Sequence, residues 1–415
     1  LRVALMSVSV CDSGHLMPVD EAIATLLAQA PPPPSIQVIG LEQALGRVIA
    51  EELFSPLDLP GFDNSAMDGY ALRAQDVPAE GGYLMLAGRV AAGQHSTTNV
   101  QAGQAVRIFT GAPVPPGADT VVPQERCRPY GQRIWCPPVR LGEHVRKQGE
   151  ELQRGQTLIA VGKRLRAQDI GLLASAGIPR LKVYRPLRVC LLSSGNELRD
   201  PGEALVPGQI YNSNRYALAA LLRGWGVDVH DYGVMADELA ASRDALALAS
   251  SECDLLLTSA GVSVGEEDHL KQAIEELGRV DFWRLAIQPG KPLAFGEVAG
   301  KPWLGLPGNP SAALITALVV VRPFLLRAQG MTDVLPTPVA VPAGFDWLQP
   351  NKRRQYLRAR LSPGEDGQLR AVLHPQQSSA MLTAACWADG LVIVEREHQV
   401  LKDEPVPFVS FAEFL

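Results

Sequence analysis

The chain of 415 residues is poor in the residues that build cysteine or histidine metal sites. Its six cysteines are scattered without a C-x-x-C pair, which argues against a zinc site or a disulfide framework and favours a reducing compartment. Its seven histidines form no HExxH or HxH arrangement, so a histidine-rich metal centre has no support. Cys127 and Cys136 could face each other across a hairpin, but we interpret them as two unrelated core thiols.

The chain also lacks a long apolar run and a basic excess. Its longest apolar run, residues 312–321, is interrupted by Arg322 and Pro323 and is too short to span a bilayer. The first 11 residues lack the cleavage pattern of a signal peptide. The net charge of −6 argues against a general nucleic-acid binder. We therefore expect a cytoplasmic protein that contacts neither membrane nor nucleic acid.

Glycine and proline, by contrast, are abundant, with 38 and 33 residues, and they predict many tight loops. A chain of this length should contain roughly two to four domains. We predict an N-terminal mixed or helical domain, an inserted β-rich domain, an α/β domain and a C-terminal β domain. These span residues 1–54 with 150–186, 55–149, 187–331 and 332–415, respectively.

The α/β domain is predicted from alternating strand and helix patterns. Its expected strands are 188–193, 227–233, 255–259 and 303–306, and its expected helices are 216–223, 239–251, 270–277 and 311–328. Such alternation is typical of a doubly wound, mostly parallel sheet. Elsewhere we expect helices at 18–30 and 167–177, and strands at 83–86, 105–108, 120–122, 133–136, 337–342, 355–361, 368–373 and 390–395. The last four would form a small barrel or sandwich.

The most informative segment is 254–268, DLLLTSAGVSVGEED. It begins as a buried strand, continues through a loop with Gly261 and Gly265, and ends on three carboxylates before a helical pattern. This order predicts a site for a phosphate and a metal at the carboxyl end of a parallel strand.

Two more loops follow predicted strands in the same way. Strand 188–193 leads into SSGNE, and strand 303–306 leads into PGNPS, where Asn309 should cap a helix and Pro310 should open it. One such loop alone would be read as a structural turn, but three on one sheet edge favour a site. The loop residues expected to bind an oxyanion are Ser194, Gly195, Gly261, Ser263, Pro307, Gly308, Asn309 and Pro310.

Three carboxylates should meet at that edge: Glu197, Asp237 and Asp268. Carboxylates beside a phosphate repel it unless a cation lies between them, and Mg²⁺ held by one or two carboxylates and substrate oxygens resolves the conflict. For Asp237 taken alone, a helix cap or a solvated charge is the better interpretation.

Basic residues supply candidate anion ligands. Lys291 lies in the rigid loop QPGKP and is a candidate ligand, although a solvated lysine is nearly as good an interpretation. The segment 351–360, NKRRQYLRAR, carries five basic residues, and as a strand it would place Tyr356, Arg358 and Arg360 on one face. A solvated hairpin or a nucleic-acid patch are its alternatives, and the acidic net charge weakens the second.

Together these segments resemble the molybdopterin molybdenumtransferase family, the MoeA and gephyrin E-domain proteins. The matching text is PGFDNSAMDGYA, RIFTGAPVPPGADTVVPQE, SSGNEL, GQIYNSNR, GVSVGEED, PGKPLAFG and LPGNPSA, in family order. The resemblance implies a cytoplasmic homodimer of elongated protomers that inserts molybdate into adenylylated molybdopterin, cleaves the adenylate and needs Mg²⁺. It also implies an active site between the α/β domain of one protomer and parts of the other.

The resemblance assigns roles to residues that composition leaves open. Asp68 and Thr110 match site residues of the inserted domain, and Glu197, Asp237 and Asp268 match acidic site residues of the α/β domain. These three carboxylates would organise the metal and water. Lys291, Pro307, Pro310 and Arg358 match further site residues, and Arg284 or Arg358 would help to hold molybdate.

The chain departs from the family pattern at four positions. Arg284 and Gln288 stand where the family often has lysine, Glu151 replaces an aspartate, and Ala260 stands where a second glycine is common. The change at Gln288 removes a cation from an oxyanion pocket, whereas Arg284 keeps the charge but offers a fork in place of a point donor. The sequence thus predicts either retained activity or a paralogue with altered oxyanion preference.

Two other functions fit the same sequence. One is adenylylation of molybdopterin, which related sheet domains perform. The other is a scaffold that binds a partner protein without turnover, against which the retained carboxylates speak. Transient contact with a molybdopterin adenylyltransferase or with cofactor acceptor proteins is expected for the favoured function.

Overall fold

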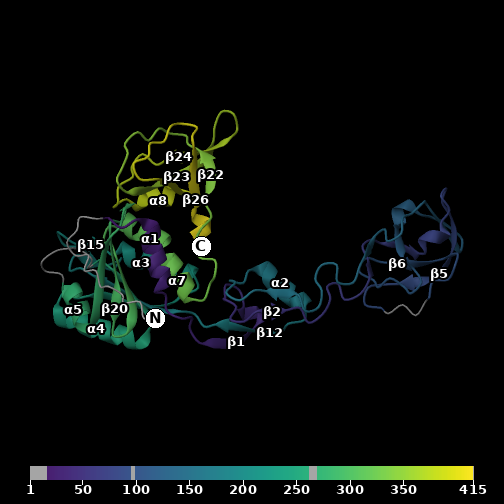
Figure 1. Cartoon of the computed structure of the whole chain (residues 1–415), viewed down its shortest axis with the longest axis horizontal. Helices are drawn as coiled ribbons and strands as arrows, with labels where there is room; N and C mark the ends of the chain where they lie inside the picture. Colours follow the sequence, from purple (N-terminus) through teal and green to yellow (C-terminus); the bar gives the residue numbers. More distant parts are fainter. Residues whose placement is uncertain (1–15, 95–98, 261–268, 415) are drawn as a thin grey trace, which may run out of the picture.

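The computed structural model describes residues 16–94, 99–260 and 269–414, with the side chains of Phe282 and Trp283 left out. The protomer is elongated (Figure 1). The α/β domain and the C-terminal β domain lie together at one end, the N-terminal domain lies in the middle, and the inserted β domain lies at the far end of a long connector.

The α/β domain contains one six-stranded sheet in the order β16-β13-β17-β21-β20-β18. Its strands are β13 (Arg188–Ser194), β16 (Asp228–Met235), β17 (Leu255–Ser259), β18 (Gly278–Arg284), β20 (Pro292–Val298) and β21 (Lys301–Leu306). The first four strands in sheet order are parallel, whereas β20 runs antiparallel to both of its neighbours, β21 and β18. The predicted mostly parallel sheet is therefore confirmed, and the hairpin of β18 and β20 is an addition that the sequence pattern did not reveal.

Helices cover both faces of this sheet. They are α3 (Ser213–Gly224), α4 (Leu239–Glu252), α5 (His269–Leu277), α6 (Pro310–Thr316) and α7 (Arg322–Ala328), with a π-helical segment, Ala317–Val321, joining the last two. Alternate residues of β13 face opposite layers. Val189 and Leu191 pack toward α3 and α7, and Cys190 and Leu192 pack toward α4 and α5. Helix α1 (Val19–Ala28) joins the first layer through Leu26.

The stretch 310–328 is helical throughout, because Pro323 falls in the first turn of α7, where a proline is tolerated. By length and composition this 19-residue stretch could cross a membrane, with a mean hydropathy of 1.7. However, 83% of its apolar window is buried inside the protein. It is the central helix of the α/β core.

Two expectations about cysteine were wrong. Cys190 on β13 and Cys253 after α4 form a disulfide, with their Cα atoms 5.9 Å apart. Their sequence separation of 63 hid this proximity, which arises because α4 returns its C-terminal end to the start of β17. Cys127 and Cys136 are not unrelated thiols either, since both are buried and their sulfur atoms lie 3.9 Å apart.

The N-terminal domain is built on β1 (Ile36–Gly40), which pairs antiparallel with β12 (Arg180–Tyr184). Helix α2 (Ala167–Ser175) packs its Leu173 into the same core as Leu181. The chain leaves through β2 (Leu53–Phe54) and returns through β11 (Thr157–Ile159), which pair antiparallel. The inserted domain is thus entered and left through neighbouring strands.

The connector continues as a two-stranded ribbon. Leu59 and Leu152 exchange backbone hydrogen bonds, and β3 (Asn64–Ser65) pairs with β10 (Val145–Arg146). Side chains cross-link the ribbon between these points. Asp58 accepts hydrogen bonds from the backbone N–H of Arg154 and the side chain of Gln148, and Asp63 accepts from Lys147. Polar bonds therefore hold a segment that is too thin for an apolar core.

The inserted domain is a six-stranded sheet in the order β7-β4-β6-β5-β9-β8. Its strands are β4 (Gly69–Leu72), β5 (Gly82–Val90), β6 (Gln104–Ile108), β7 (Thr120–Pro123), β8 (Arg128–Tyr130) and β9 (Arg133–Cys136). The strands expected at 83–86, 105–108, 120–122 and 133–136 are confirmed. Buried residues of β4 and β6, including Ala71 and Ile108, form part of its core.

The C-terminal domain borrows a strand from the α/β segment. Its sheet has the order β19-β23-β25-β26-β22, with β24 paired to β23, and it is accompanied by helix α8 (Leu382–Trp387). The strands are β19 (Ile287–Gln288), β22 (Val339–Pro342), β23 (Arg354–Pro363), β24 (Leu369–Leu373), β25 (Gly390–Val394) and β26 (Pro405–Ser410). The four predicted strands are confirmed, whereas β19, β26 and α8 were not foreseen.

The α2 helix rests on a buried carboxylate whose removal should be measurable. Burial alone would raise the pKa of Asp169, but hydrogen bonds from Arg166 and Lys163 outweigh it and lower that pKa to about 2. An aspartate in an unfolded chain titrates near pH 3.9, at about its ordinary value. The stabilisation is therefore complete above about pH 4 and is lost as the pH falls toward 2. We expect Asp169→Asn to lower the free energy of unfolding by about 1–3 kcal/mol at pH 7.

Urea denaturation of wild type and variant between pH 2 and 7 checks this expectation, and the difference between them should shrink below about pH 4. Asp244→Asn is the control, because the Asp244 side chain is 75% exposed and its pairing with Arg243 should contribute little. An equal effect of both substitutions would contradict the role given to Asp169.

Candidate active site

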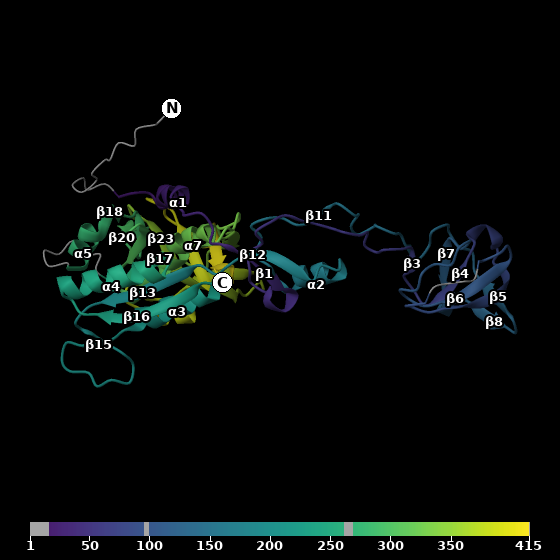
Figure 2. The same cartoon turned by 90° about the horizontal axis from the view of Figure 1, so that it is seen from below.

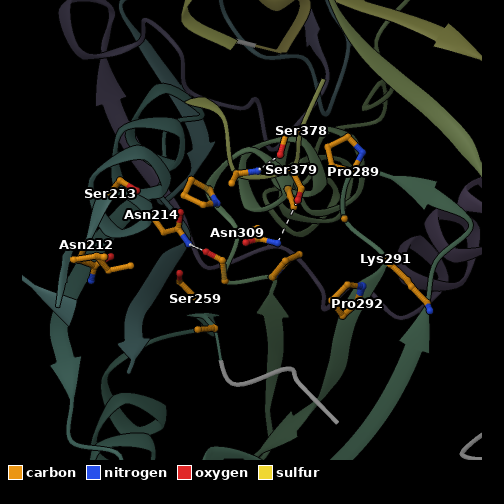
Figure 3. Close-up of a pocket in the computed structure, with 18 of the residues that line it drawn as sticks. Asn212, Ser213, Asn214, Ser259, Pro289, Lys291, Pro292, Asn309, Ser378 and Ser379 are labelled. Carbon is orange, nitrogen blue, oxygen red and sulfur yellow. Dashed lines mark hydrogen bonds between the residues drawn. The ribbon is translucent and has the colours of Figure 1, made fainter. Parts of the chain in front are cut away.

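A cavity of about 870 Å³ lies between the α/β domain and the C-terminal domain (Figure 3). It opens at the carboxyl ends of the parallel strands, where ligands bind in sheets of this kind. Figure 2 shows the long loop between β14 (Leu198–Arg199) and β15 (Ile210–Tyr211), which projects from the same domain. Residues that line the cavity include Glu197, Asn212, Asn214, Ser259, Ala260, Gln288, Lys291, Pro307, Gly308, Asn309, Pro310, Arg353, Gln377, Ser378 and Ser379.

Two amide side chains fix the walls of the cavity. The Nδ2 group of Asn214 donates to the Gly308 carbonyl at 2.8 Å, which holds the start of α3 against the PGNP turn. The Nδ2 group of Asn309 donates to Ser379 Oγ at 3.2 Å, which links that turn to the C-terminal domain. Both bonds are drawn in Figure 3. The cavity therefore has walls from two domains that are joined by side-chain hydrogen bonds.

This geometry corrects one detail of the sequence analysis. Asn309 does occupy the N-cap position of α6 and Pro310 opens the helix, but the Asn309 side chain makes no capping bond. The Ala312 N–H, one of the amides expected to be free, donates instead to the Ser379 carbonyl at 3.1 Å. The Ala312 amide is therefore not free for an anion at this wall.

The described charged residues that line the cavity are Glu197, Lys291 and Arg353. Lys291 and Asn212 lie on opposite sides of the view in Figure 3, with Asn309 and Ser259 between them. Lys291 follows β19 and Arg353 immediately precedes β23, which pairs with β19. Lys291 and Arg353 thus both lie next to the pairing of β19 with β23, which we call the seam between the two domains.

Arg358 lies beside the cavity and is fully buried. Its Nη2 group donates to the Ser378 carbonyl at 3.0 Å, and its backbone N–H donates to Gln377 Oε1 at 2.9 Å. Its Nε and Nη1 atoms have no hydrogen-bond partner among the described residues, and burial lowers the pKa of this guanidinium to about 10. A buried guanidinium with two free donors is costly unless an anion satisfies it.

The turn after β13 carries the predicted residues Gly195 and Glu197. Gly195 has a φ of +145°, and a Cβ atom there would lie 2.6 Å from the Glu197 carboxylate. The Glu197 carboxylate is the end of a flexible side chain and could move, so it is the positive φ that favours glycine at this position. Ser194 is buried at the end of β13 and does not line the cavity.

Asp237 and Arg284 also lie outside the cavity lining. The Asp237 backbone N–H donates to Asn196 Oδ1 at 3.5 Å, so Asp237 sits next to the turn that carries Glu197. Arg284 ends β18, and its side chain is exposed. The predicted residues Gly261, Ser263 and Asp268 lie outside the described residues.

Ala260 is held in a strained backbone conformation at the cavity wall. Its φ is +73°, in the left-handed region that costs a residue with a side chain about 1–2 kcal/mol. A Cβ atom added at Gly308 would lie 3.6 Å from the Ala260 Cβ, which is an ordinary van der Waals contact. The cost of alanine at this position therefore comes from its backbone conformation and not from crowding against Gly308.

Asp68 and Thr110 form a separate pair in the inserted domain. The Thr110 backbone N–H and hydroxyl donate to Asp68 Oδ1 at 2.8 and 2.7 Å. These two hydrogen bonds lower the pKa of Asp68 and keep it ionised. The domain that carries the pair is far from the cavity of its own chain (Figure 1). The structure therefore does not bring this pair together with Glu197 or Lys291 within one protomer.

Sequence reasoning missed several polar residues of the site, among them Asn214, Arg353, Gln377 and Ser379. Asn214 belongs to the matched text GQIYNSNR, and the polar run 376–379 (QQSS) was a signal that could have been noticed. Arg353 was counted only as part of a basic segment. Its position at the cavity follows from the pairing of β19 with β23, which no local pattern reveals.

Comparison with known proteins accounts for nearly the whole chain. The model of the MoeA N-terminal region (domain I and II) matches residues 17–177, that of a probable molybdopterin binding domain matches 190–327, and that of the MoeA C-terminal region (domain IV) matches 340–411. A molybdopterin molybdenumtransferase of Haemophilus influenzae is 35% identical over 404 residues, which cover 96% of this chain and 100% of that protein. The chain belongs to the molybdopterin molybdenumtransferase (MoeA) family. It is thus an enzyme of this family.

Further members of the MoeA family are also similar to this chain in sequence or in structure. Molybdopterin molybdenumtransferase 2 of Mycobacterium tuberculosis is 37% identical over 337 residues, or 78% of this chain and 82% of that protein. A crystal structure of a MoeA protein from Pyrococcus horikoshii has a TM-score of 0.81 at 25% identity and covers 95% of this chain and 100% of that one. The resemblance found in the sequence and the multidomain α/β fold are therefore confirmed.

The unpaired guanidinium of Arg358 leads to a prediction about stability. Arg358→Met keeps the length of the side chain but removes a buried charge with two unsatisfied donors. Without added anion we expect the variant to be at least as stable as wild type. Molybdate at about 100 times its Kd should stabilise wild type by about 2.7 kcal/mol and the variant by much less.

Thermal unfolding with and without molybdate measures both effects. Arg360→Met is the matched control, because Arg360 is on the same strand but is exposed and stacks over the Trp387 ring at 4.4 Å. A molybdate shift that is the same in Arg358→Met and wild type would rule out Arg358 as an anion ligand.

Proposed function

We propose that this enzyme inserts molybdate into adenylylated molybdopterin and releases AMP in a Mg²⁺-dependent reaction. The names of its curated relatives support the transfer of molybdenum to molybdopterin. The observation that carries the proposal is the cavity between the domains, which Lys291 and Arg353 line and beside which Arg358 keeps two unpartnered donors. Dithiolene, phosphate and molybdate are all electron-rich, so such a cavity suits them.

The size and the polar lining of the cavity also suit the proposed substrate. Its volume of about 870 Å³ is large enough for a pterin joined to a nucleotide, and falls within the usual range for small-molecule sites. Asn212, Asn214 and Asn309 offer amide groups along the wall, and Ser259, Ser378 and Ser379 offer hydroxyls. These neutral groups would orient the substrate, while the cations would bind its negative groups.

The donor chemistry of the sheet edge fits a magnesium ion that the substrate helps to hold. Among the described residues no group of three or more carboxylate, histidine or cysteine side chains is gathered. Mg²⁺ commonly takes only one or two carboxylates and fills its shell with water and substrate phosphate. Glu197 in the cavity would be one ligand, with Asp268 and Asp237 as the others. When bound, the ion would neutralise the pyrophosphate that is cleaved.

The residues of this chain would act by binding and orientation. Glu197 would face the substrate from the edge of the cavity, on the turn that Gly195 permits. Lys291 would hold negative charge on the leaving adenylate, and Arg358 would hold molybdate through its two free donors. The pairing of β19 with β23 would keep Lys291 and Arg353 at a constant separation.

We further propose that the active unit is a homodimer in the cytoplasm, in which each cavity is completed by the partner's Asp68 and Thr110. Support comes from the separation of this pair from the cavity of its own chain (Figure 1). Oligomers of one chain are usually symmetric, so two equal composite sites would form. Transient contact with a molybdopterin adenylyltransferase would deliver the substrate.

Glu197→Gln and Asp268→Asn should each lower molybdate-dependent AMP release by about a hundredfold or more, because each removes a negative ligand from the metal. The measurement is AMP release from adenylylated molybdopterin with molybdate and Mg²⁺, and the dimer should persist in gel filtration. Incubation with ATP and molybdopterin, without molybdate, is the control for adenylylation. Wild-type turnover in both variants, or transfer of AMP onto the pterin, would refute the proposal.

Composite sites make mixed dimers informative. Asp68→Asn and Glu197→Gln should each be inactive alone. When they are co-expressed in equal amounts, mixed dimers would contain one intact site and restore roughly a quarter of wild-type activity, as expected for random pairing in a symmetric dimer. Co-expression of Glu197→Gln with Asp268→Asn is the control, because both of these inactive variants carry their change in the α/β domain. If mixed dimers of the first pair stay inactive, the site is not shared between protomers.

A further inference from the structure

We infer that Arg353 supplies the second cation of the oxyanion site and that Gln288 is the positioning residue that holds it there. The inference rests on the proposed function and goes beyond it, because it names how this chain compensates for glutamine where a lysine is common. The ligand class is a tetrahedral dianion such as molybdate.

The contacts around Gln288 carry the inference. Its Oε1 atom accepts a hydrogen bond from Asn351 Nδ2 at 2.6 Å and one from Arg353 Nη2 at 3.4 Å. Asn351 Oδ1 in turn accepts from the Arg353 backbone N–H at 3.0 Å. Gln288 and Arg353 both line the cavity and both are half-buried. The Gln288 amide thus anchors both the loop at Asn351 and the guanidinium group of Arg353.

The neighbours of Arg353 show that this placement is specific. Arg354 turns away and forms ion pairs with Asp20 at 2.7 Å and with Glu395 at 3.0 Å. The Lys352 side chain is exposed and does not line the cavity. Of these three consecutive basic residues, only Arg353 borders the cavity, and it forms no ion pair within the described part of the chain.

The neutrality of Gln288 matters for the electrostatics. An amide oxygen orients the guanidinium without cancelling its charge, so Arg353 remains free to attract an anion. A lysine at position 288 would repel Arg353 and remove its acceptor. A glutamate there would keep the acceptor but neutralise the cation through an ion pair. Only a neutral acceptor both holds and preserves the charge.

The exchange of a lysine for a positioned arginine changes how an oxyanion is bound. A guanidinium offers two parallel donors in a fixed plane, whereas an ammonium is a point charge on a flexible stem. Two oxygens of a tetrahedral anion can accept from that fork together. With Lys291 near the same pair of strands and Arg358 beside the cavity, the site would combine two guanidinium groups with one point charge.

The test measures molybdate binding by calorimetry and the KM for molybdate in AMP release, with the full-length protein. Arg353→Gln should raise both constants by about tenfold or more, because it removes charge-assisted hydrogen bonds. Lys352→Gln makes the same change of charge one residue away and should alter both constants by less than about twofold. Arg353→Lys should fall between them.

Gln288 variants separate positioning from structural support. Gln288→Glu preserves shape and acceptor, so a purely structural role predicts wild-type binding, whereas our inference predicts a rise in KM approaching that of Arg353→Gln, with kcat little changed. Equal constants for Arg353→Gln and Lys352→Gln, or wild-type binding in Gln288→Glu, would overturn the inference. If wild type itself shows no molybdate-dependent AMP release, the proposed function fails as well; if wild type turns over and Arg353→Gln matches it, only this inference fails.

Discussion

The candidate site depends on one short strand, β19, which lies in the α/β segment of the chain but pairs with the sheet of the C-terminal domain. The chain leaves the α/β sheet at the end of β18, pairs through β19 with β23 of the C-terminal domain, and then returns to the sheet as β20. Backbone hydrogen bonds, including one from the Arg354 N–H to the Ala286 carbonyl at 2.8 Å, hold the two domains in register. The ion pair of Arg354 with Asp20 adds a tie from α1 to the same seam. Gln288 lies in β19 and Lys291 comes three residues after it. The position of both residues at the cavity is therefore set by main-chain pairing and not by side-chain packing alone.

Much of this arrangement could be predicted from local patterns. The buried parallel strands β13, β17 and β21 are short apolar runs followed by glycine-rich turns, and such runs identify both the strand and the loop after it. The same logic placed Glu197 and the PGNP turn at one edge, where the structure has them. Strand β26 was missed because two of its first three residues, Pro405 and Pro407, are prolines, which are unusual in strands. Strand β19 was missed because two residues carry no periodicity.

The finer chemistry of the site could not be predicted, because it arises from contacts between segments far apart in the chain. Asn309 has the residue type and position of a helix cap, yet Ser379, 70 residues later, takes its side chain. Arg358 was expected on a strand face, but nothing local indicates that it is fully buried with two free donors. The disulfide of Cys190 with Cys253 was hidden for the same reason.

The two-stranded connector gives the inserted domain the mechanics of a lever. Its base is the pairing of Leu59 with Leu152, and its far end carries Asp68 and Thr110. A small rotation at the base would therefore displace that pair through a much larger arc. The hydrogen bonds of Asp58 and Asp63 across the ribbon resist such rotation. The position of Asp68 and Thr110 would thus be governed by the stiffness of a ribbon only two strands wide, and substitutions in that ribbon could alter it.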